Sequence, residues 1–507
     1  MMNRLSTLCL AVGLLFAGTA SAEDVAVPTM DERNEAFEQV NTAMVSGNKA
    51  AAADELIALT ENPDWPVFHA EAYARLAVLL NQMDLPYSAL VAYTKALELD
   101  PEGVSSEVQK AVALADKVGD QAILEPVFAS NIGLSVDDAT RSRMAYLAAR
   151  ENQRRGNLGV AGAMLQMVEA KDPYYPEAKS LEGIILALQG RHEAALTPLQ
   201  IALATGARAK RGDEFKATVT LNLARAYYAA GNYPQASQYW SQIEREDPKW
   251  LDAQFERAWA HFRMEDMNGV LALLQNHVSP YFQDRYYPEA SMLRLYALFL
   301  LCKFPDASKQ LEDFQAQYRP QQVELLRVST MSPTSLFDAI RRHIETGSSD
   351  LPTMITAPLA HEDRMKDSIN AIFNAEQEIA RLRNVGANTF AQSAMEWLTE
   401  RRATLVKSEG DRIQARAASM EAELNEMLSN SDVTKLDLMQ METRLLERAS
   451  FTGKMPESKR RVKRQVRARV TERIWDWQGE YWADEIGYFR VDTKPECPEG
   501  MRAGSAN

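Results

Sequence analysis

The residue types that usually carry catalysis or bind metals are scattered along this chain of 507 residues. A helical zinc site needs two histidines four residues apart with a glutamate beside the first, and no pair of histidines here has that spacing. The six histidines are His69, His192, His261, His277, His343 and His361. The run His361-Glu362-Asp363 is expected to cap a helix, and the chain has neither a glycine-rich phosphate loop nor a G-x-S-x-G motif. The sequence therefore predicts no catalytic residue, no metal site and no cofactor.

A segment near the C-terminus, residues 456–490, combines cationic and aromatic side chains. Its candidate surface-anchoring residues are Lys459, Arg460, Arg461, Lys463, Arg464, Arg467, Trp475, Trp477 and Trp482. One interpretation is contact with an anionic membrane, a cell-wall polymer or an acidic partner. The other is that the apolar side docks on the rest of the protein while the arginines pair with carboxylates there. The acidic composition favours docking.

The first 22 residues have the layout of a cleaved secretory signal. Arg4 precedes an apolar run, and Ala20-Ser21-Ala22 supplies the small residues of a cleavage site. We expect cleavage near Ala22 and a periplasmic product, with secretion as the alternative. No later stretch has the roughly 18 consecutive apolar residues that a membrane span requires.

Two cysteines, Cys302 and Cys497, remain after signal removal. In an oxidising compartment they either form one disulfide that ties the tail to the rest of the chain or stay as two free thiols. The sequence gives no distance between them, so both alternatives stay open. The formal charge of −14 argues against a nucleic-acid binder, because phosphate neutralisation needs clustered cations.

Within residues 24–320, small residues recur with a turn residue, a second small residue and a large residue at similar offsets after them. These positions indicate pairs of helices. Ala224 is followed by Gly231 at a turn, Ala236 on a second helix and the large Trp240. Related offsets recur from the anchors Ala77, Ala149, Gly183, Ala258 and Leu295. The pentapeptide Tyr-Tyr-Pro-Glu-Ala also occurs twice, at 174–178 and 286–290, each time ending five residues before an anchor. Small side chains at such intervals let neighbouring helices approach closely.

This pattern resembles the tetratricopeptide repeat family, in which antiparallel helix pairs stack into a superhelix with a concave side. The resemblance implies an all-α solenoid of about seven to eight helix pairs over residues 24–320, the first and third of them degenerate. It also implies a surface that binds other proteins.

Positions beside each anchor on the first helix of a pair are expected to line the concave side. The candidate partner-binding residues are Arg150, Arg154, Arg225, Tyr228, Phe255, Trp259, Phe262, Arg263, Tyr296 and Phe299. Aromatic residues and arginines dominate interface energetics, and an extended peptide or an amphipathic helix would suit such a groove. The alternative is that the C-terminal helices fill it.

The repeat pattern ends at Pro320. Residues 321–358 are predicted to be a linker with one short helix, and residues 359–455 a helical hairpin or small bundle. Separate helices are expected there over 362–384, 389–407, 411–428 and 435–449. Residues 456–490 are predicted to be a basic and aromatic helix with a turn, and residues 491–507 a flexible tail.

These features together predict a non-catalytic periplasmic scaffold or adaptor that binds protein partners in a cell-envelope assembly. A short Trp and Gly-Tyr tract within 475–488 resembles exported envelope proteins, including ones tied to gliding machinery, so a motility role is included. The alternatives are a membrane or cell-wall polymer binder acting through residues 456–490, and a peptidoglycan-associated enzyme.

Overall fold

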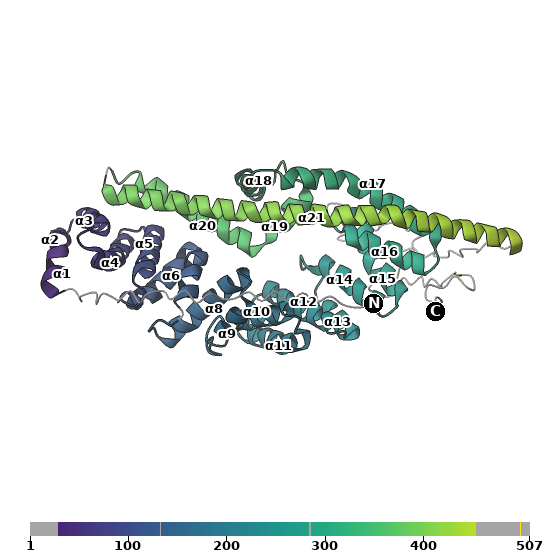
Figure 1. Ribbon diagram of the computed structural model, residues 1–507, viewed down its shortest axis with the longest axis horizontal. Helices are drawn as coiled ribbons and strands as arrows, with labels where there is room; N and C mark the ends of the chain where they lie inside the picture. The colour runs from purple at the N-terminus through teal and green to yellow at the C-terminus, as the bar shows by residue number, and fades with distance from the viewer. Residues whose placement is uncertain (1–28, 132, 283–284, 387, 453–496, 498–507) are drawn as a thin grey trace, which may run out of the picture.

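The computed structural model describes residues 29–452, except 132, 283–284 and 387, together with Cys497. The described part is helical and contains no strand (Figure 1), so the predicted all-α solenoid with a C-terminal helical region is confirmed. No helix among these residues combines the length and apolar character that crossing a membrane requires.

Most of the chain is an array of consecutive antiparallel helix pairs, α1 to α17. After α1 (Met30–Ala36), the pairs are α2 (Glu38–Val45) with α3 (Lys49–Glu61), α4 (His69–Gln82) with α5 (Pro86–Leu99), α8 (Asp138–Arg154) with α9 (Leu158–Leu165), α10 (Tyr175–Leu188) with α11 (His192–Arg208), α12 (Asp213–Ala229) with α13 (Tyr233–Trp240), α14 (Trp250–Arg263) with α15 (Met267–Leu274), and α16 (Pro288–Leu300) with α17 (Phe304–Ser329). An irregular unit of α6 (Val108–Val118) and the short α7 (Glu125–Ser130) lies between α5 and α8.

The sequence register is visible in the backbone of the array. All six anchors are buried, and the residue seven places after each one has a left-handed backbone, which turns the chain between the paired helices. These turn residues are Asp84, Gly156, Gly190, Gly231, Glu265 and Cys302, with φ between 56° and 81°. At the anchor Gly183, an added Cβ would lie 2.4 Å from Leu199 Cγ. The small anchor is therefore required by the close approach of α10 and α11.

Beyond the array, the one short helix predicted within 321–358 is present, but the rest of this segment is also largely helical and is not a linker. Helix α17 continues through Pro320 to Ser329, and α18 (Pro333–Thr346) and α19 (Thr353–His361) follow it. Leu325, Val328 and Phe337 are fully buried in the core that these helices share with the last repeats. Tertiary packing thus maintains a helix that the proline alone would be expected to end.

The C-terminal region holds two long helices, α20 (Asp363–Leu382) and α21 (Thr389–Thr452), which we call the strap. They form a hairpin, which was one of the two predicted arrangements, the other being a small bundle. The helix breaks expected near residues 408–410 and 429–434 are absent, so that part of the prediction is wrong. Helix α21 is continuous over 64 residues. A Cβ on Gly410 would lie 2.0 Å from the Pro333 carbonyl oxygen. Gly410 therefore allows α21 to pass close to the start of α18 and does not end a helix.

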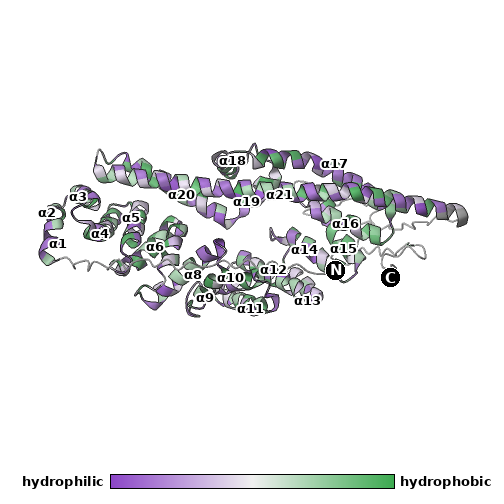
Figure 2. Cartoon of the chain, viewed as in Figure 1, coloured by the Kyte–Doolittle hydropathy of each residue, from purple (hydrophilic) through white to green (hydrophobic). Residues whose placement is uncertain are grey.

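The strap connects two cores at opposite ends of the array (Figure 1). Ala375, Phe390 and Leu398 pack in the core of the N-terminal repeats, whereas Ile413 and Leu424 pack in the core of the C-terminal repeats with α18 and α19. Apolar and polar residues alternate along α21 (Figure 2), as expected for a helix packed on one side and solvated on the other.

Polar contacts hold the strap on the N-terminal repeats. The Glu378 carboxylate accepts hydrogen bonds from the backbone N–H groups of Tyr87, at 2.9 Å, and Ser88, at 2.6 Å. These are free donors at the start of α5, so the strap caps that helix. Arg401 donates to both oxygens of the buried Asp120 at 2.7 Å.

Candidate binding cavity

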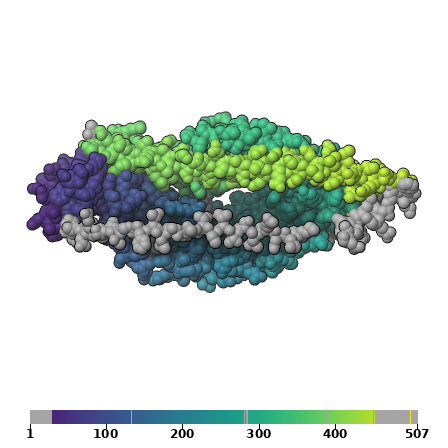
Figure 3. Space-filling model, in the orientation of Figure 1, coloured from purple at the N-terminus to yellow at the C-terminus, as the bar shows by residue number. Residues whose placement is uncertain are grey.

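The strap spans the concave side of the array and leaves an opening beside the middle repeats (Figure 3). A cavity of about 840 Å³ lies there, between the first turns of α12 and α14 and the C-terminal helices α19 to α21. The groove that was expected to be either open or filled is thus bridged at its ends and hollow near its middle.

One side of the cavity, here called the array wall, belongs to two adjacent repeats. Its charged residues are Asp213, Glu214, Lys216, Glu244, Glu246, Asp247, Lys249 and Asp252. They come from the N-terminal end of α12, from the connection between α13 and α14, and from the first turn of α14. Two of them form an ion pair, in which Lys249 Nζ lies 3.6 Å from Glu214 Oε1. Asp247 Oδ1 also accepts from the Lys249 backbone N–H at 2.8 Å, which shapes the entry to α14.

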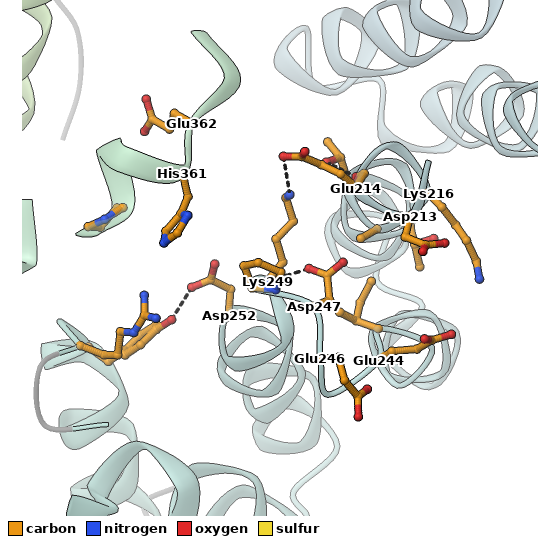
Figure 4. A pocket seen from close by; sticks show the side chains of 18 of the residues that line it. Asp213, Glu214, Lys216, Glu244, Glu246, Asp247, Lys249, Asp252, His361 and Glu362 are labelled. Atoms are coloured by element: carbon orange, nitrogen blue, oxygen red, sulfur yellow. Dashed lines mark hydrogen bonds and ion pairs between the residues drawn. The ribbon is translucent and has the colours of Figure 1, made fainter. Parts of the chain in front are cut away.

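The opposite side, the far wall, is formed by the residues before α16 and by α19 to α21. Its charged and titratable residues are Arg285, His361, Glu362, Arg364, Lys366 and Arg416. Figure 4 shows His361 and Glu362 across the cavity from Glu214, Lys249 and Asp252. The histidine expected only to cap a helix therefore lines a cavity, while Glu362 does stand at the N-cap of α20, although without a side-chain cap hydrogen bond.

Ion pairs fix the far wall. Glu362 accepts from Arg416 at 2.7 Å and from Arg412 at 2.5 Å, and the buried Glu409 accepts from Arg364 at 2.9 Å. These pairs join the start of α20 to the middle of α21. The charges of these arginines and glutamates are therefore largely neutralised by each other.

A tyrosine connects the two walls at one edge. Tyr287 donates its hydroxyl hydrogen to Asp252 Oδ1 at 2.5 Å (Figure 4). Burial and the neighbouring Asp252 carboxylate raise the pKa of Tyr287 above its ordinary value, so the phenol stays protonated and keeps donating. Asp252 is therefore a structural part of the cavity.

None of the ten candidate concave residues lines this cavity. The three arginines on α8 and α12 have partners within the array. Arg150 and Arg154 both pair with the buried carboxylate of Glu125, and Arg225 pairs with Glu256. A buried acid that is ionised needs such partners, so these arginines serve the fold.

The aromatic candidates are mostly packed against neighbouring rings. Ring centroid distances are 5.3 Å for Tyr228 to Tyr233, 6.1 Å for Phe255 to Tyr287, 5.7 Å for Trp259 to Phe262 and 5.5 Å for Phe299 to Phe304. The Arg263 guanidinium lies 5.1 Å from the Tyr233 ring centre. Tyr296 keeps 37% of its surface exposed. The structure does not bring the ten residues together as one site.

Cys302 and Cys497 form a disulfide across 195 residues of sequence. Of the two alternatives, a disulfide or two free thiols, the structure therefore contains the disulfide. Cys302 is the left-handed turn residue between α16 and α17. The candidate anchoring residues between Lys459 and Trp482 lie outside the described residues.

Sequence reasoning missed the cavity because most of its far wall lies on α19 to α21, far along the chain from the array wall on α12 and α14. The available signal was the density of acidic residues between Glu244 and Asp252, which reads equally well as an ordinary solvated loop. Across the described residues, no group of three or more His, Cys, Asp or Glu side chains is placed to hold a metal ion.

The paired helices and their turns define a fold of the tetratricopeptide-repeat type. No protein-family model and no curated protein matches the chain. Solved structures do. The repeats of a putative kinesin light chain from Podosopora anserina are 19% identical and cover 37% of this chain and 99% of their own, with a TM-score of 0.31. A tetratricopeptide repeat protein from Parabacteroides merdae is 15% identical over 56% of this chain and 92% of its own, with a TM-score of 0.27. The apo form of RapI is 11% identical over 74% and 98%, with a TM-score of 0.33.

Proposed function

We propose that this protein is a non-catalytic scaffold that binds an extended segment of a partner protein in the cavity between the array and the strap. One observation carries the proposal: α20 and α21 bridge the ends of the array, yet leave a polar cavity of about 840 Å³ next to the middle repeats. A space with charged walls stays hydrated, so it is available to a ligand that can replace the water.

The nature of the ligand follows from the shape of the site. The cavity opens between two long structures and is not a closed chamber (Figure 3). An extended polypeptide is slender enough to enter such a space and offers polar groups to both walls. This proposal replaces the aromatic groove as the binding surface, because most of the aromatic candidates are packed against neighbouring rings.

The place of action that we propose is the periplasm, within a cell-envelope assembly such as one involved in motility. The signal-like residues 1–22 support it, and a disulfide between Cys302 and Cys497 suits an oxidising compartment. If so, the native mature protein should begin near Glu23 and show no reactive thiol after denaturation. N-terminal sequencing and thiol labelling check this, and two labelled cysteines would contradict it.

The binding proposal is tested by blocking the cavity. Thr218 on α12 lines it, and Thr197 on α11 is exposed and outside it. Each is changed to cysteine in the full chain, and the single added thiol is coupled to a bulky maleimide–polyethylene glycol. We expect co-purification of partner proteins from the native envelope to be lost for modified Thr218→Cys and kept for modified Thr197→Cys. Equal retention of partners by both would contradict the proposal.

A further inference from the structure

The distribution of charge around the cavity indicates what kind of peptide it takes. The array wall holds six carboxylates and two lysines, so it carries four negative charges in excess. The far wall holds four Lys and Arg residues and one carboxylate. The cavity is therefore polarised, with its acidic side on the repeats.

The two sides differ in how far their charges are already neutralised. On the far wall, Arg364 is held by Glu409 and Arg416 by Glu362. On the array wall, Asp213, Glu244 and Glu246 are exposed and form no ion pair with any described residue. A cationic ligand would meet these carboxylates directly, whereas an anionic one would have to compete for Arg364 and Arg416, which already have partners.

The acidic groups are also spread out. Asp213 and Glu214 begin α12. Glu244, Glu246 and Asp247 occupy the connection from α13 to α14, and Asp252 lies in the first turn of α14. A single small cation would contact only one of these places. A chain with several cationic side chains can contact them together, and each contact adds to the affinity.

We propose that the cavity binds an extended peptide rich in lysine or arginine, with its cationic side chains against the array wall. This inference rests on the proposed function and specifies the chemistry of the partner. The binding should weaken as ionic strength rises, because the attracting charges are near solvent.

The test uses the full chain and three fluorescent peptides of about 12 residues, ~40 Å long when extended, in which every second residue is Lys, Glu or Gln. The variant Asp213→Asn/Glu244→Gln/Glu246→Gln removes the free carboxylates. The control Asp64→Asn/Glu98→Gln/Glu193→Gln makes the same change of net charge at exposed residues away from the cavity. Fluorescence anisotropy reports binding.

We expect the Lys peptide to bind best, the cavity variant to weaken it about tenfold, and the control to change it less than about twofold. Binding of the Glu or Gln peptide with equal affinity would overturn the inference but leave the proposed function standing. Binding of no peptide would count against both. Equal weakening by the two variants would show non-specific charge attraction and overturn the inference.

One other occupant has to be separated by experiment, namely the chain's own basic segment. The full-chain variant that changes Lys459, Arg460, Arg461, Lys463, Arg464, Arg467, Arg469 and Arg473 to Gln serves this purpose. If the wild-type chain binds no peptide and this variant binds the Lys peptide, the cavity belongs to that segment and the inference is wrong. Similar affinities for the two chains support a separate partner.

Discussion

Glu378 shows how a single side chain fastens the strap. Its carboxylate is buried and accepts from Tyr87, Ser88 and the Ser88 hydroxyl. Burial raises the pKa of Glu378 above its reference value of 4.5, although the hydrogen bonds from Ser88 and Tyr87 partly oppose this. Burial thus destabilises the ionised carboxylate by more than these hydrogen bonds stabilise it.

This direction sets a testable pH dependence. A carboxyl whose pKa is raised by folding stabilises the folded state below its unfolded pKa, and the contribution is lost as the pH rises through the folded pKa. We expect the stability advantage of the wild type over Glu378→Gln to be largest in acid and to shrink as the pH rises from below the reference value of 4.5 through the raised pKa of folded Glu378. Urea unfolding across that range measures it.

The exposed Glu400→Gln on α21 is the control, with an expected effect below about 0.5 kcal/mol at every pH. An advantage of the wild type that grows as the pH rises would contradict the account. It would show that the ionised carboxylate, with its hydrogen bonds, is the preferred form at this site.

At the scale of elements, the sequence predicted the array well and the strap poorly. The anchors and the turn residues lie seven places apart in one local stretch, so their spacing alone indicates paired helices. The contact between Tyr87 and Glu378 spans 291 residues, so no local sequence pattern could predict it. The break expected at residues 408–410 was wrong for the same reason, because Pro333, which packs against Gly410, is distant in sequence.

The crossing of α18 and α21 makes a prediction about Gly410. A Cβ there would meet the backbone of Pro333, which cannot rotate away, so Gly410→Ala should destabilise the protein by about 1–3 kcal/mol through overpacking. Gly159 in α9 has no atom within 4 Å of an added Cβ. Gly159→Ala should be neutral or stabilise by up to about 1 kcal/mol. Thermal unfolding of both variants checks this, and equal stabilities would refute the close approach.

Considered as a whole molecule, the protein is an array whose two ends are joined by the strap. The N-terminal repeats share a core with the tip of the strap, where α20 ends and α21 begins, and the C-terminal repeats share another with the start of α20 and most of α21. The middle repeats around α11 to α13 have only small cores of their own. Such an arrangement keeps both walls of the cavity at a defined separation, which is what a site for an extended segment requires.

The central claim is that a partner segment lies between the array and the strap. The most direct measurement places a photo-activated cross-linking residue at Gln242, which lines the cavity, and in a second chain at the exposed Glu193 on α11. After illumination in the native envelope, mass spectrometry identifies the cross-linked segment. The account predicts one continuous, Lys- or Arg-rich partner segment joined at Gln242 and absent at Glu193. The same partners trapped equally at both positions, or none at Gln242, would contradict it.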